Sequence, residues 1–316
     1  MHTHVILGAG GAISKSLIRS LANKNQNFLL LSRKKKSVEG YETQAVDVLD
    51  VQSLIREIPK NSIVHMLVGF EYHVKIWEKS WVPAIKNVID VCVMKNSKLV
   101  FFDNVYSLGH VQGAMTEMSP LKPSSKKGEI RKKVIEHIQQ AIEQKGLKAL
   151  IARAADFYGP DAEQVSFLNI VLLQRVLQNK APQWIGDITA RHSYTFTDDC
   201  GKALHILSQD DSAYGQVWNM PTASPAMNGI GYVDLAYKTL STEKKKPQIM
   251  NYLLLSILGL FIRPLKETKE LYYQNKFDYV FDSSKFEKVY GFKPTSYEKG
   301  FEITFRKMQE AAKTES

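Results

Sequence analysis

A glycine-rich loop near the N-terminus is the first stretch whose residue types and spacing can do chemistry. Residues 5–14 read Val-Ile-Leu-Gly-Ala-Gly-Gly-Ala-Ile-Ser, so the glycines follow an apolar run and precede a helix-like pattern. Glycine permits a tight turn and a close approach of the backbone to a pyrophosphate, whose charge then meets the amide end of the helix. The spacing is Gly-x-x-Gly-x-x-small, with Ser14 in the third place. We expect this loop to bind a dinucleotide; the alternative is a glycine turn without a ligand.

Cations rather than an acid follow the second apolar run. Ser32 and Arg33 stand there, and lysines occupy positions 34–36. An acidic residue at this place holds the ribose 2′-hydroxyl of NAD, whereas a hydroxyl and a cation suit a 2′-phosphate. The sequence therefore favours NADP, with NAD as the second choice. Arg33 in a solvated basic turn is the alternative, and the three lysines are expected to be solvated.

The third apolar run ends in a further polar candidate. Asp47 is expected either to meet the adenine edge of the cofactor or to cap the helix that follows Asp50. The residues expected to contact the cofactor are Gly8, Gly11, Ala12, Ile13, Ser32, Arg33, Asp47, Val48, Val68 and Gly69.

Short apolar runs that alternate with helix-period segments must position these groups. The runs are apolar at consecutive positions, as expected of parallel strands that are buried on both faces. They occupy residues 5–7, 28–31, 44–48, 63–68, 99–102 and 147–152. This alternation predicts an α/β fold, a Rossmann-type doubly wound parallel sheet with a smaller C-terminal substrate-binding lobe. We expect residues 1–160 to form the NADP-binding domain, and residues 161–316 to complete the sheet and form the lobe.

Beyond residue 157 the alternation loosens. We expect a helix near 166–178, a strand near 194–197, a helix from Asp199 and a strand at 216–219. The apolar segment 253–262 is shorter than the roughly 20 residues that span a bilayer. Three roles are open for it: a wall of the substrate pocket, a dimer interface and, ranked third because the segment has no separate polar face, an interfacial membrane helix.

The composition is that of an ordinary globular protein. The 316 residues are 44% hydrophobic and carry 42 Lys and Arg against 32 Asp and Glu, a net charge of +10 that hints at anionic partners. Two distant cysteines, Cys92 and Cys200, offer neither a disulfide framework nor a zinc ribbon. No signal-peptide pattern begins the sequence, and a cytoplasmic location is expected. His2 and His4 precede the first strand, away from the cofactor edge, so no metal site is expected.

Five further segments lie along the chain in a telling order. They are Asn-Val-Ile-Asp at 87–90, Arg-Ala-Ala-Asp-Phe-Tyr-Gly-Pro at 153–160, Tyr-Thr-Phe-Thr-Asp-Asp at 194–199, Asp-Ser-Ser-Lys at 282–285 and Tyr-Gly-Phe-Lys-Pro at 290–294. Together with the glycine loop they resemble the extended short-chain dehydrogenase/reductase family, also called NAD-dependent epimerase/dehydratases, over nearly the whole chain. The resemblance implies a nicotinamide cofactor and a C-terminal lobe that closes over substrates, often nucleotide sugars.

The sequence departs from the pattern of that family at the catalytic motif. Its members use a Tyr-x-x-x-Lys pair, in which the tyrosine exchanges a proton with the substrate and the lysine lowers the pKa of the tyrosine and holds the ribose. At the expected place the sequence has Ser124 and Gly128, and Asn104 stands where the family has a catalytic serine or threonine. The sequence therefore looks like an atypical branch that lacks the pair.

Three residues are candidates for the catalytic work: Asn104, Tyr106 and Lys127. Tyr106 is expected to face the cleft beside Asn104 and act as the acid, because residues two apart on an extended segment point to the same side. Lys127 is expected to reach the ribose or to lower the pKa of that tyrosine. The alternative is that Tyr106 is a packed cleft residue and Lys127 a surface charge.

Phe157 and His192 are expected to contact the substrate, with His192 at the mouth of the cleft beside an anionic group; a solvent-exposed loop histidine is the alternative. We expect an epimerase/dehydratase-like oxidoreductase acting on a sugar nucleotide or another small carbonyl or hydroxyl compound. The alternative is a non-catalytic NADP-binding protein of the same fold, with a redox-sensing or regulatory role. A small-molecule substrate is the expected partner, and a homodimer is one assembly to consider. Basic runs without interleaved aromatics do not suggest nucleic acid, and no membrane partner is expected.

Overall fold

The apolar runs of the first half form the strands of one parallel sheet. A computed structural model describes residues 2–315 and gives the strand order β14-β9-β7-β6-β1-β2-β5, with parallel pairing throughout. The strands are β1 His4–Leu7, β2 Phe28–Ser32, β5 Gln44–Ala45, β6 Ile63–Met66, β7 Lys98–Asp103, β9 Ala149–Arg153 and β14 Val217–Asn219. This sheet confirms the predicted α/β class and Rossmann-type fold.

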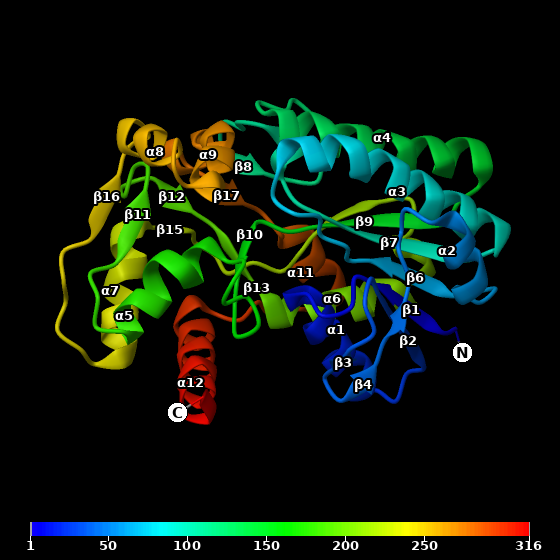
Figure 1. Ribbon diagram of the computed structural model, residues 1–316, viewed down its shortest axis with the longest axis horizontal. Coiled ribbons are helices and arrows are strands. Elements are labelled where there is room, and N and C mark those ends of the chain that lie inside the picture. Colours follow the sequence, from blue (N-terminus) through cyan, green and yellow to red (C-terminus); the bar gives the residue numbers. More distant parts are fainter. Residues whose placement is uncertain (1, 316) are drawn as a thin grey trace.

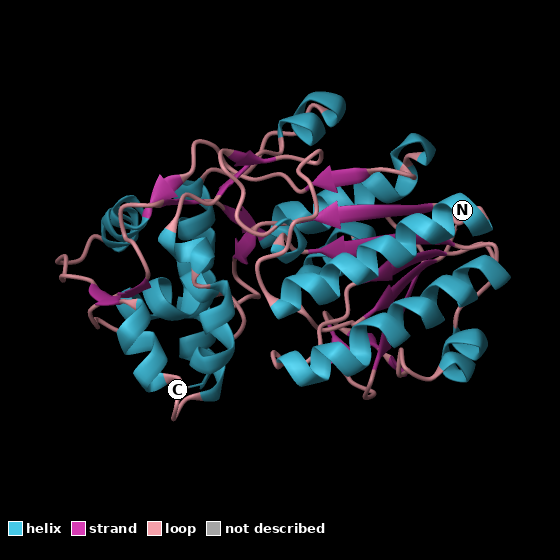
Figure 2. Ribbon diagram, turned by 90° about the horizontal axis from the view of Figure 1, so that it is seen from above, coloured by secondary structure: helices cyan, strands magenta, loops and turns pink. Residues whose placement is uncertain are grey.

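Helices cover both faces of the sheet because each strand buries side chains on both sides. Val5 and Leu7 pack on one face with helices α2, α3 and α4, whereas Ile6 packs on the other with α1, α6 and α11. Figures 1 and 2 show the sheet between these two helical layers. The helices are α1 Ala12–Ala22, α2 Val51–Glu57, α3 Val74–Met94, α4 Lys126–Lys145, α6 Thr197–Gln209 and α11 Ser284–Tyr290.

The third strand of the parallel sheet along the chain is much shorter than the apolar run that predicts it. Only Gln44–Ala45 pairs with β2, and the predicted strand at 44–48 is therefore wrong over its last three residues. The carboxylate of Asp47 accepts the N–H of Leu49 at 2.9 Å, which turns the chain away from the sheet edge. Val46 and Val48 are buried all the same, so the apolar pattern reports their burial rather than strand pairing.

A separate apolar core holds the C-terminal part together. Tyr158, Trp184, Tyr194, Tyr232 and Phe301 meet in it. The elements around this core are β10 Asp156–Tyr158, the π-helical turn η2 Asn169–Leu173, α5 Gln174–Leu177, β11 Gln183–Ile185, β13 Tyr194–Phe196, α7 Gly229–Leu240, β16 Gln248–Met250 and α12 Tyr297–Glu315. The helix predicted near 166–178 and the strand near 194–197 correspond to η2 with α5 and to β13.

Short strands tie the two parts of the molecule together at the edge of the sheet where the strands end. These strands pair as β10 with β13, β12 with β15 and β17 with β8. The remaining elements are β3 Ser37–Val38, β4 Tyr41–Glu42, β8 Ala114–Met115, β12 Arg191–His192, β15 Met227–Asn228, β17 Val280–Phe281, α8 Tyr252–Leu258, α9 Arg263–Thr268, α10 Tyr273–Lys276, and the 3₁₀ turns η1 Tyr106–Leu108, η3 Asp211–Ala213 and η4 Lys269–Leu271. Figure 1 shows α8 and α9 at an outer corner of the lobe.

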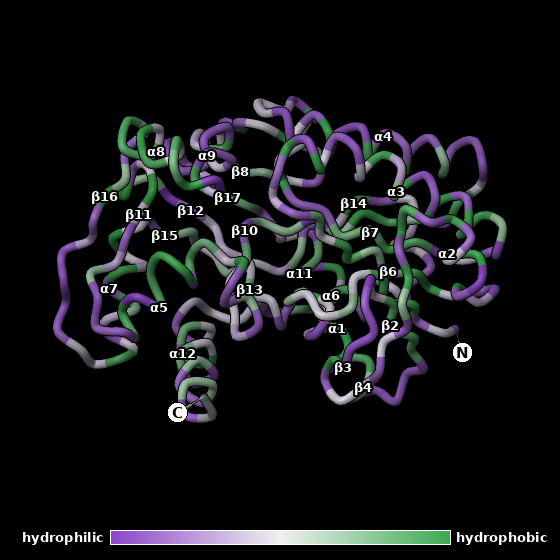
Figure 3. Tube along the Cα trace, viewed as in Figure 1, coloured by the Kyte–Doolittle hydropathy of each residue, from purple (hydrophilic) through white to green (hydrophobic). Residues whose placement is uncertain are grey.

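Hydropathy follows this layout. The hydrophobic residues concentrate in the strands and inner helix faces, and a second hydrophobic stretch lies at the outer corner formed by α8 (Figure 3). Cys92 and Cys200 are both free and buried. Among residues 2–315 no helix is long and apolar enough to cross a membrane.

Candidate functional site

The glycine loop packs the end of β1 directly against the segment that follows β6. Gly8 has a φ of +89°, and a Cβ there would lie 2.8 Å from backbone atoms of Val68. Both features exclude other residues, because side chains rarely adopt this φ and the backbone of Val68 fills the space. Gly69, the next residue, has open space where its Cβ would be. The predicted cofactor residues Gly8, Val68 and Gly69 therefore lie together at one sheet edge.

The first turn of α1 presents its amide groups at that edge. Gly11 caps the helix without a side-chain hydrogen bond, and Ala12 and Ile13 begin it. First-turn amides have no partner within a helix, so they suit an anion. Ser14 Oγ accepts the N–H of Gly10 at 2.9 Å and donates to the carbonyl of Gly11 at 2.8 Å. Ser14, in the third-glycine place, thus fixes the shape of the loop.

Lys36 is exposed, as the sequence predicts, and it also lies against the loop. A Cβ at Gly10 would lie 2.2 Å from Nζ of Lys36, so this ammonium group stands directly over the glycine. Arg33 is exposed, as a 2′-phosphate ligand needs to be. The hydroxyl of Ser32 is buried and donates to the carbonyl of Lys34 at 2.6 Å. The edge of the loop therefore carries Arg33 and Lys36 as its positive groups.

The two roles weighed for Asp47 are resolved in part. Asp50, not Asp47, caps α2, because its carboxylate accepts the N–H of Gln52 at 3.0 Å. Asp47 is exposed and holds its own turn. Val48 is buried, and its carbonyl accepts from Asn87 at 3.1 Å, which joins this turn to α3. Asp47 therefore stays a candidate for the adenine side of the site.

Asn104 and Tyr106 lie at the end of β7, but not on an extended segment. The side-chain oxygen of Asn104 accepts the N–H of Tyr106 at 3.0 Å, and the chain enters the turn η1. The geometric reason given for placing both side chains on one side is therefore wrong: an Asx turn, not strand alternation, sets the direction of Tyr106. The ring of Tyr106 stacks on Trp77, with 6.2 Å between ring centroids.

Tyr106 and Tyr72 are neighbours at this edge, where Tyr106 is half-buried and Tyr72 is 37% exposed. Burial, the neighbouring Tyr72 and the charge of Asp156 raise the pKa of Tyr106 well above its usual value. Burial also raises the pKa of Tyr72. Both hydroxyls therefore remain protonated at neutral pH, which suits a proton donor and not a base.

His192 is part of a buried stack, not an exposed loop residue. It is 2% exposed and lies between the rings of Tyr194 and Tyr279, with centroids 4.5 and 4.2 Å away. Its Nε2 lies 3.1 Å from the Oδ2 atom of Asp156. The N–H of Asp156 donates to the hydroxyl of Tyr279 at 3.2 Å. Phe157 follows Asp156 in β10 and is partly buried. The predicted substrate residues thus flank a carboxylate that sequence reasoning did not single out.

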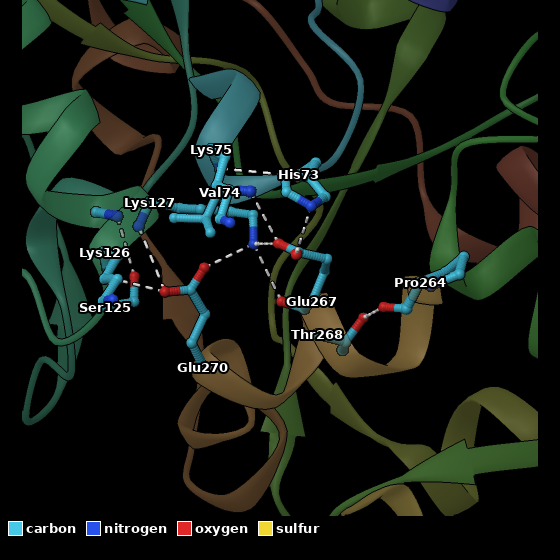
Figure 4. Close-up of polar contacts among 11 residues, drawn as sticks. His73, Val74, Lys75, Ser125, Lys126, Lys127, Pro264, Glu267, Thr268 and Glu270 are labelled. Atoms are coloured by element: carbon cyan, nitrogen blue, oxygen red, sulfur yellow. Dashed lines mark hydrogen bonds and ion pairs between the residues drawn. The ribbon is translucent and has the colours of Figure 1, made fainter. Parts of the chain in front are cut away.

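Lys127 is buried between two carboxylates. Its Nζ lies 2.6 Å from Glu267 of α9 and 2.6 Å from Glu270 of η4, and it stands 4.4 Å from the ring centroid of Tyr72. Figure 4 shows both glutamates reaching across to the starts of α3 and α4. Glu267 accepts the N–H of Val74 at 3.0 Å, and Glu270 accepts the N–H at 126 at 2.8 Å. Lys127 is therefore no surface charge.

The carboxyl group of Glu267 is stabilised in its ionised form. Burial acts against ionisation of Glu267, but the hydrogen bonds from Lys127 and Val74 outweigh it and lower the pKa of this carboxyl group. A negative charge at a helix N-terminus is also favoured by the helix dipole. The contact therefore joins α9 and η4 to the sheet domain by charge.

Ser124 and Gly128 contact the loop after β7. The N–H of His110 donates to Ser124 Oγ at 3.3 Å. A Cβ at Gly128 would lie 2.4 Å from the carbonyl oxygen of Tyr106. Position 128 therefore packs directly on η1 and leaves no room for a lysine side chain in this arrangement.

A further charged group at the same edge was missed by sequence reasoning. Asp103, the last residue of β7, is buried and accepts from Arg131 at 2.5 and 2.9 Å. Arg153, its register partner on β9, lies 3.5 Å away. The sequence signal for this contact is that the two neighbouring strands end in residues of opposite charge. No comparable pattern announced Tyr72, Lys36 or the two glutamates, because each approaches from a distant part of the chain.

Within residues 2–315 no group of three or more His, Cys, Asp or Glu side chains could hold a metal ion. His4 is instead buried, with its Nδ1 2.9 Å from Nε2 of His65.

Comparison with known proteins agrees with this geometry. The model of the NAD dependent epimerase/dehydratase family matches residues 4–220. Similar solved structures include a dTDP-glucose 4,6-dehydratase from Streptomyces venezuelae with NAD and TYD bound (16% identity, 99% of this chain and 98% of that chain, TM-score 0.79). A UDP-N-acetylglucosamine 4-epimerase from Bacillus cereus is also similar (16%, 98% and 97%, TM-score 0.77), as is a UDP-glucose 4-epimerase from Thermus thermophilus in complex with NAD (15%, 98% and 99%, TM-score 0.76). No curated protein sequence matches the chain significantly. At these identities the structures establish a common fold.

Proposed function

Because the chain belongs to the NAD-dependent epimerase/dehydratase family, we propose that it is an NAD(P)-dependent oxidoreductase or epimerase. Its proposed substrate is a sugar nucleotide or another small compound with a carbonyl or hydroxyl group. The observation that carries this proposal is the position of Asn104 and Tyr106 directly after β7, at the carboxyl end of the parallel strands, with Tyr106 stacked on Trp77. Ligands of doubly wound sheets bind at that edge.

NADP is the proposed cofactor, with NAD as the other option. Support comes from the loop at Gly8, which lets the backbone come close, and from the first-turn amides of α1, which suit a pyrophosphate. Arg33 would hold the 2′-phosphate, and Lys36 would add positive charge over Gly10. Asp47, Val48, Val68 and Gly69 are proposed to line the adenine and ribose sides. When bound, such a cofactor gives or takes a hydride at the substrate carbon.

Tyr106 is the proposed proton donor. Its raised pKa keeps the proton on the hydroxyl until an oxygen of greater basicity, such as a developing alkoxide, takes it. Tyr72 lies beside Tyr106 and is 37% exposed, so it offers a path to solvent by which that proton is replaced. Asn104 positions the donor through the backbone amide of Tyr106. These residues would do the work of the Tyr-x-x-x-Lys pair, which we propose is missing from this branch of the family.

Lys127 is proposed to support this chemistry only when its ion pairs open. With Glu267 and Glu270 at 2.6 Å, its ammonium group is committed and does not lower the pKa of Tyr106. Movement of α9 and η4 would free it to meet a ribose hydroxyl. Phe157 and His192 are proposed on the substrate side, with His192 orienting Asp156.

Turnover of the purified protein tests the proposal. Small carbonyl compounds are screened for substrate-dependent oxidation of NADPH, and sugar nucleotides are also screened for conversion of the sugar itself, because an epimerase regenerates its cofactor. The active compound is then used with Tyr106→Phe. Removal of a general acid costs about 100-fold or more in kcat. Tyr41→Phe, a change at an exposed tyrosine of β4 that packs on Phe28 at the start of β2, is the matched control. An unchanged kcat for Tyr106→Phe would show that another group donates the proton.

A second function has a specific observation in its favour. The committed ion pairs of Lys127 suit a non-catalytic NADP-binding protein that reports cofactor occupancy to a partner. That protein would bind NADPH tightly and oxidise it with none of the screened compounds. Any substrate-dependent turnover excludes it.

A further inference from the structure

The corner of the lobe formed by α8 and the turn after it exposes large apolar side chains. Leu253, Leu260 and Phe261 are 69, 79 and 84% exposed. Tyr252, Leu254, Ile257 and Ile262 are exposed beside them. We call these seven residues the apolar tip. Only Leu255 of α8 is fully buried, so the helix is anchored by one side and presents apolar groups on the other. Contiguous exposure of this kind marks an interaction surface.

The tip projects from the molecule rather than lining a groove. It occupies the outer corner of the lobe (Figure 1), where the hydropathy colouring shows hydrophobic residues at the molecular boundary (Figure 3). Projecting apolar groups suit insertion between lipid chains, since they need no complementary pocket in a partner.

The residues around the tip are positively charged. Residues 244–277 contain seven Lys or Arg and two acidic residues, Glu267 and Glu270. Both carboxylates turn inward onto Lys127 and the starts of α3 and α4, as Figure 4 shows. Arg263 and Lys266 follow the tip and are exposed. Arg263 lies 3.9 Å from the exposed carboxylate of Glu71, a solvent-screened ion pair that is weak enough to exchange for a lipid phosphate. The outward surface of this segment therefore combines apolar groups with cations.

From this combination we propose that the apolar tip docks the protein onto an anionic phospholipid surface. Leu253, Leu260 and Phe261 enter the boundary between head groups and acyl chains, while Arg263 and Lys266 pair with lipid phosphates. Each basic residue near such a surface adds to the attraction, and apolar insertion adds to it independently. The sequence ranked this role third because α8 lacks a polar face; the structure supplies the polar groups from α9.

Charge also argues against a second copy of the chain on this surface. A symmetric dimer through the tip would bring the same cations of two chains together, each with a net charge of +10. An anionic surface avoids that repulsion. The proposal is independent of the proposed enzymatic function, because no residue of the tip belongs to the candidate site.

Co-sedimentation with vesicles tests the docking. The full chain is mixed with vesicles of equal parts phosphatidylglycerol and phosphatidylcholine, and with vesicles of phosphatidylcholine alone. We expect binding to the anionic vesicles that falls at high salt, and at least about tenfold weaker binding to the neutral ones. The double variant Leu260→Asp/Phe261→Asp is expected to lose binding at least about tenfold, with an unchanged melting temperature because both side chains are exposed.

Matched control variants distinguish binding through the apolar tip from nonspecific hydrophobic binding and from the effect of net charge. Met118→Asp/Val165→Asp changes two exposed apolar residues elsewhere, 89 and 64% exposed, and should bind as the parent chain does. Arg263→Glu/Lys266→Glu should weaken binding, whereas Lys132→Glu/Lys133→Glu on α4 makes the same change in net charge and should not.

Four outcomes overturn the proposal. They are no binding to anionic vesicles, equal binding to neutral vesicles, binding that survives the Leu260→Asp/Phe261→Asp change, and a concentration-dependent dimer in sedimentation that the same change abolishes. The last result would assign the tip to a second copy of the chain.

Discussion

Lys127 shows how much a single residue can depend on distant parts of the chain. Its ammonium group is fully buried and has two carboxylate partners more than 130 positions away in the sequence. A buried charge is tolerated only when it is paired and hydrogen-bonded. The ion pairs are therefore a structural joint between the sheet domain and α9, whatever else Lys127 does.

Removal of that ammonium group should be costly. Lys127→Met leaves Glu267 and Glu270 without their cation, and we expect the free energy of unfolding to fall by about 3 kcal/mol. Urea unfolding measures it. Lys132→Met, five positions along the same helix, removes only a half-exposed pair and should cost under about 0.5 kcal/mol. Equal losses for the two variants would mean that the joint contributes nothing.

The buried histidine pair makes stability depend on pH. Burial, His205 and His2 lower the pKa of His4 from 6.5 to about 4, and burial lowers that of His65 well below 6.5. The unfolded chain therefore binds more protons than the folded one as the pH falls below about 6.5. We expect the free energy of unfolding to drop by about 3 kcal/mol or more between pH 6.5 and pH 4.

Urea unfolding across that interval measures the drop, and His65→Gln serves as the comparison. The variant removes one of the two titrating groups, so its stability should depend less steeply on pH even where its absolute stability is lower. A slope equal to that of the parent chain would assign the acid sensitivity to other groups, such as Glu267.

At the level of single residues the sequence predicted identities better than geometry. It picked Tyr106 and Asn104, but it derived their placement from an extended backbone, whereas the Asn104 side chain makes a turn there. It picked His192 at the mouth of the cleft, with an exposed loop as the alternative, since nothing local shows that Tyr194 and Tyr279 enclose the ring. Side-chain partners from distant segments are what a single sequence leaves out.

At the level of elements, the glycine loop connects β1, α1 and the segment after β6. Gly8 allows the end of β1 and the segment after β6 to touch, and α1 starts from the same loop. Any shift of Val68 would move both the loop and the residues that lead to Tyr72. The loop therefore joins the proposed phosphate side of the site to the proposed catalytic side.

Gly8→Ala should break that joint. The added methyl group meets Val68 at 2.8 Å on a backbone with a φ of +89°, so we expect a loss of about 2 kcal/mol or more in stability and a large loss of NADPH affinity. Gly69→Ala adds the same methyl group to open space nearby and should change stability by less than about 0.5 kcal/mol. Calorimetry measures the stability of both variants, and cofactor titration measures their NADPH affinity. Equal losses in the two variants would refute the packing role of Gly8.

The sequence predicted the strands that are buried over several residues, and it missed the strands outside the main sheet that pair over only two residues. Parallel strands that are buried on both faces have continuous apolar sequences. The observed bounds of five strands therefore lie close to the predicted ones: β1, β2, β6, β7 and β9. Strands of two residues, such as β8 with β17 or β12 with β15, pair segments far apart in the chain and carry too few residues for any pattern. The C-terminal lobe is built from such pieces.

At the level of the whole molecule, charge divides the surface into two working edges. The glycine loop with Arg33 and Lys36 forms the proposed cofactor side, and the apolar tip with its cations faces outward from the lobe. Glu267 and Glu270 connect them, because they hold α9 to Lys127 at the candidate site. The net charge of +10, which the sequence alone left without a target, thus has two places to act.

Cofactor binding is the most direct test of the account as a whole. Nicotinamide fluorescence is followed while the purified protein is titrated with NADPH and, in parallel, with NADH. We predict binding of both with a preference of about tenfold or more for NADPH, and loss of that preference in Arg33→Glu. Preference for NADH would keep the fold and remove the phosphate role of Arg33, whereas binding of neither would contradict the assignment of the glycine loop as a cofactor site.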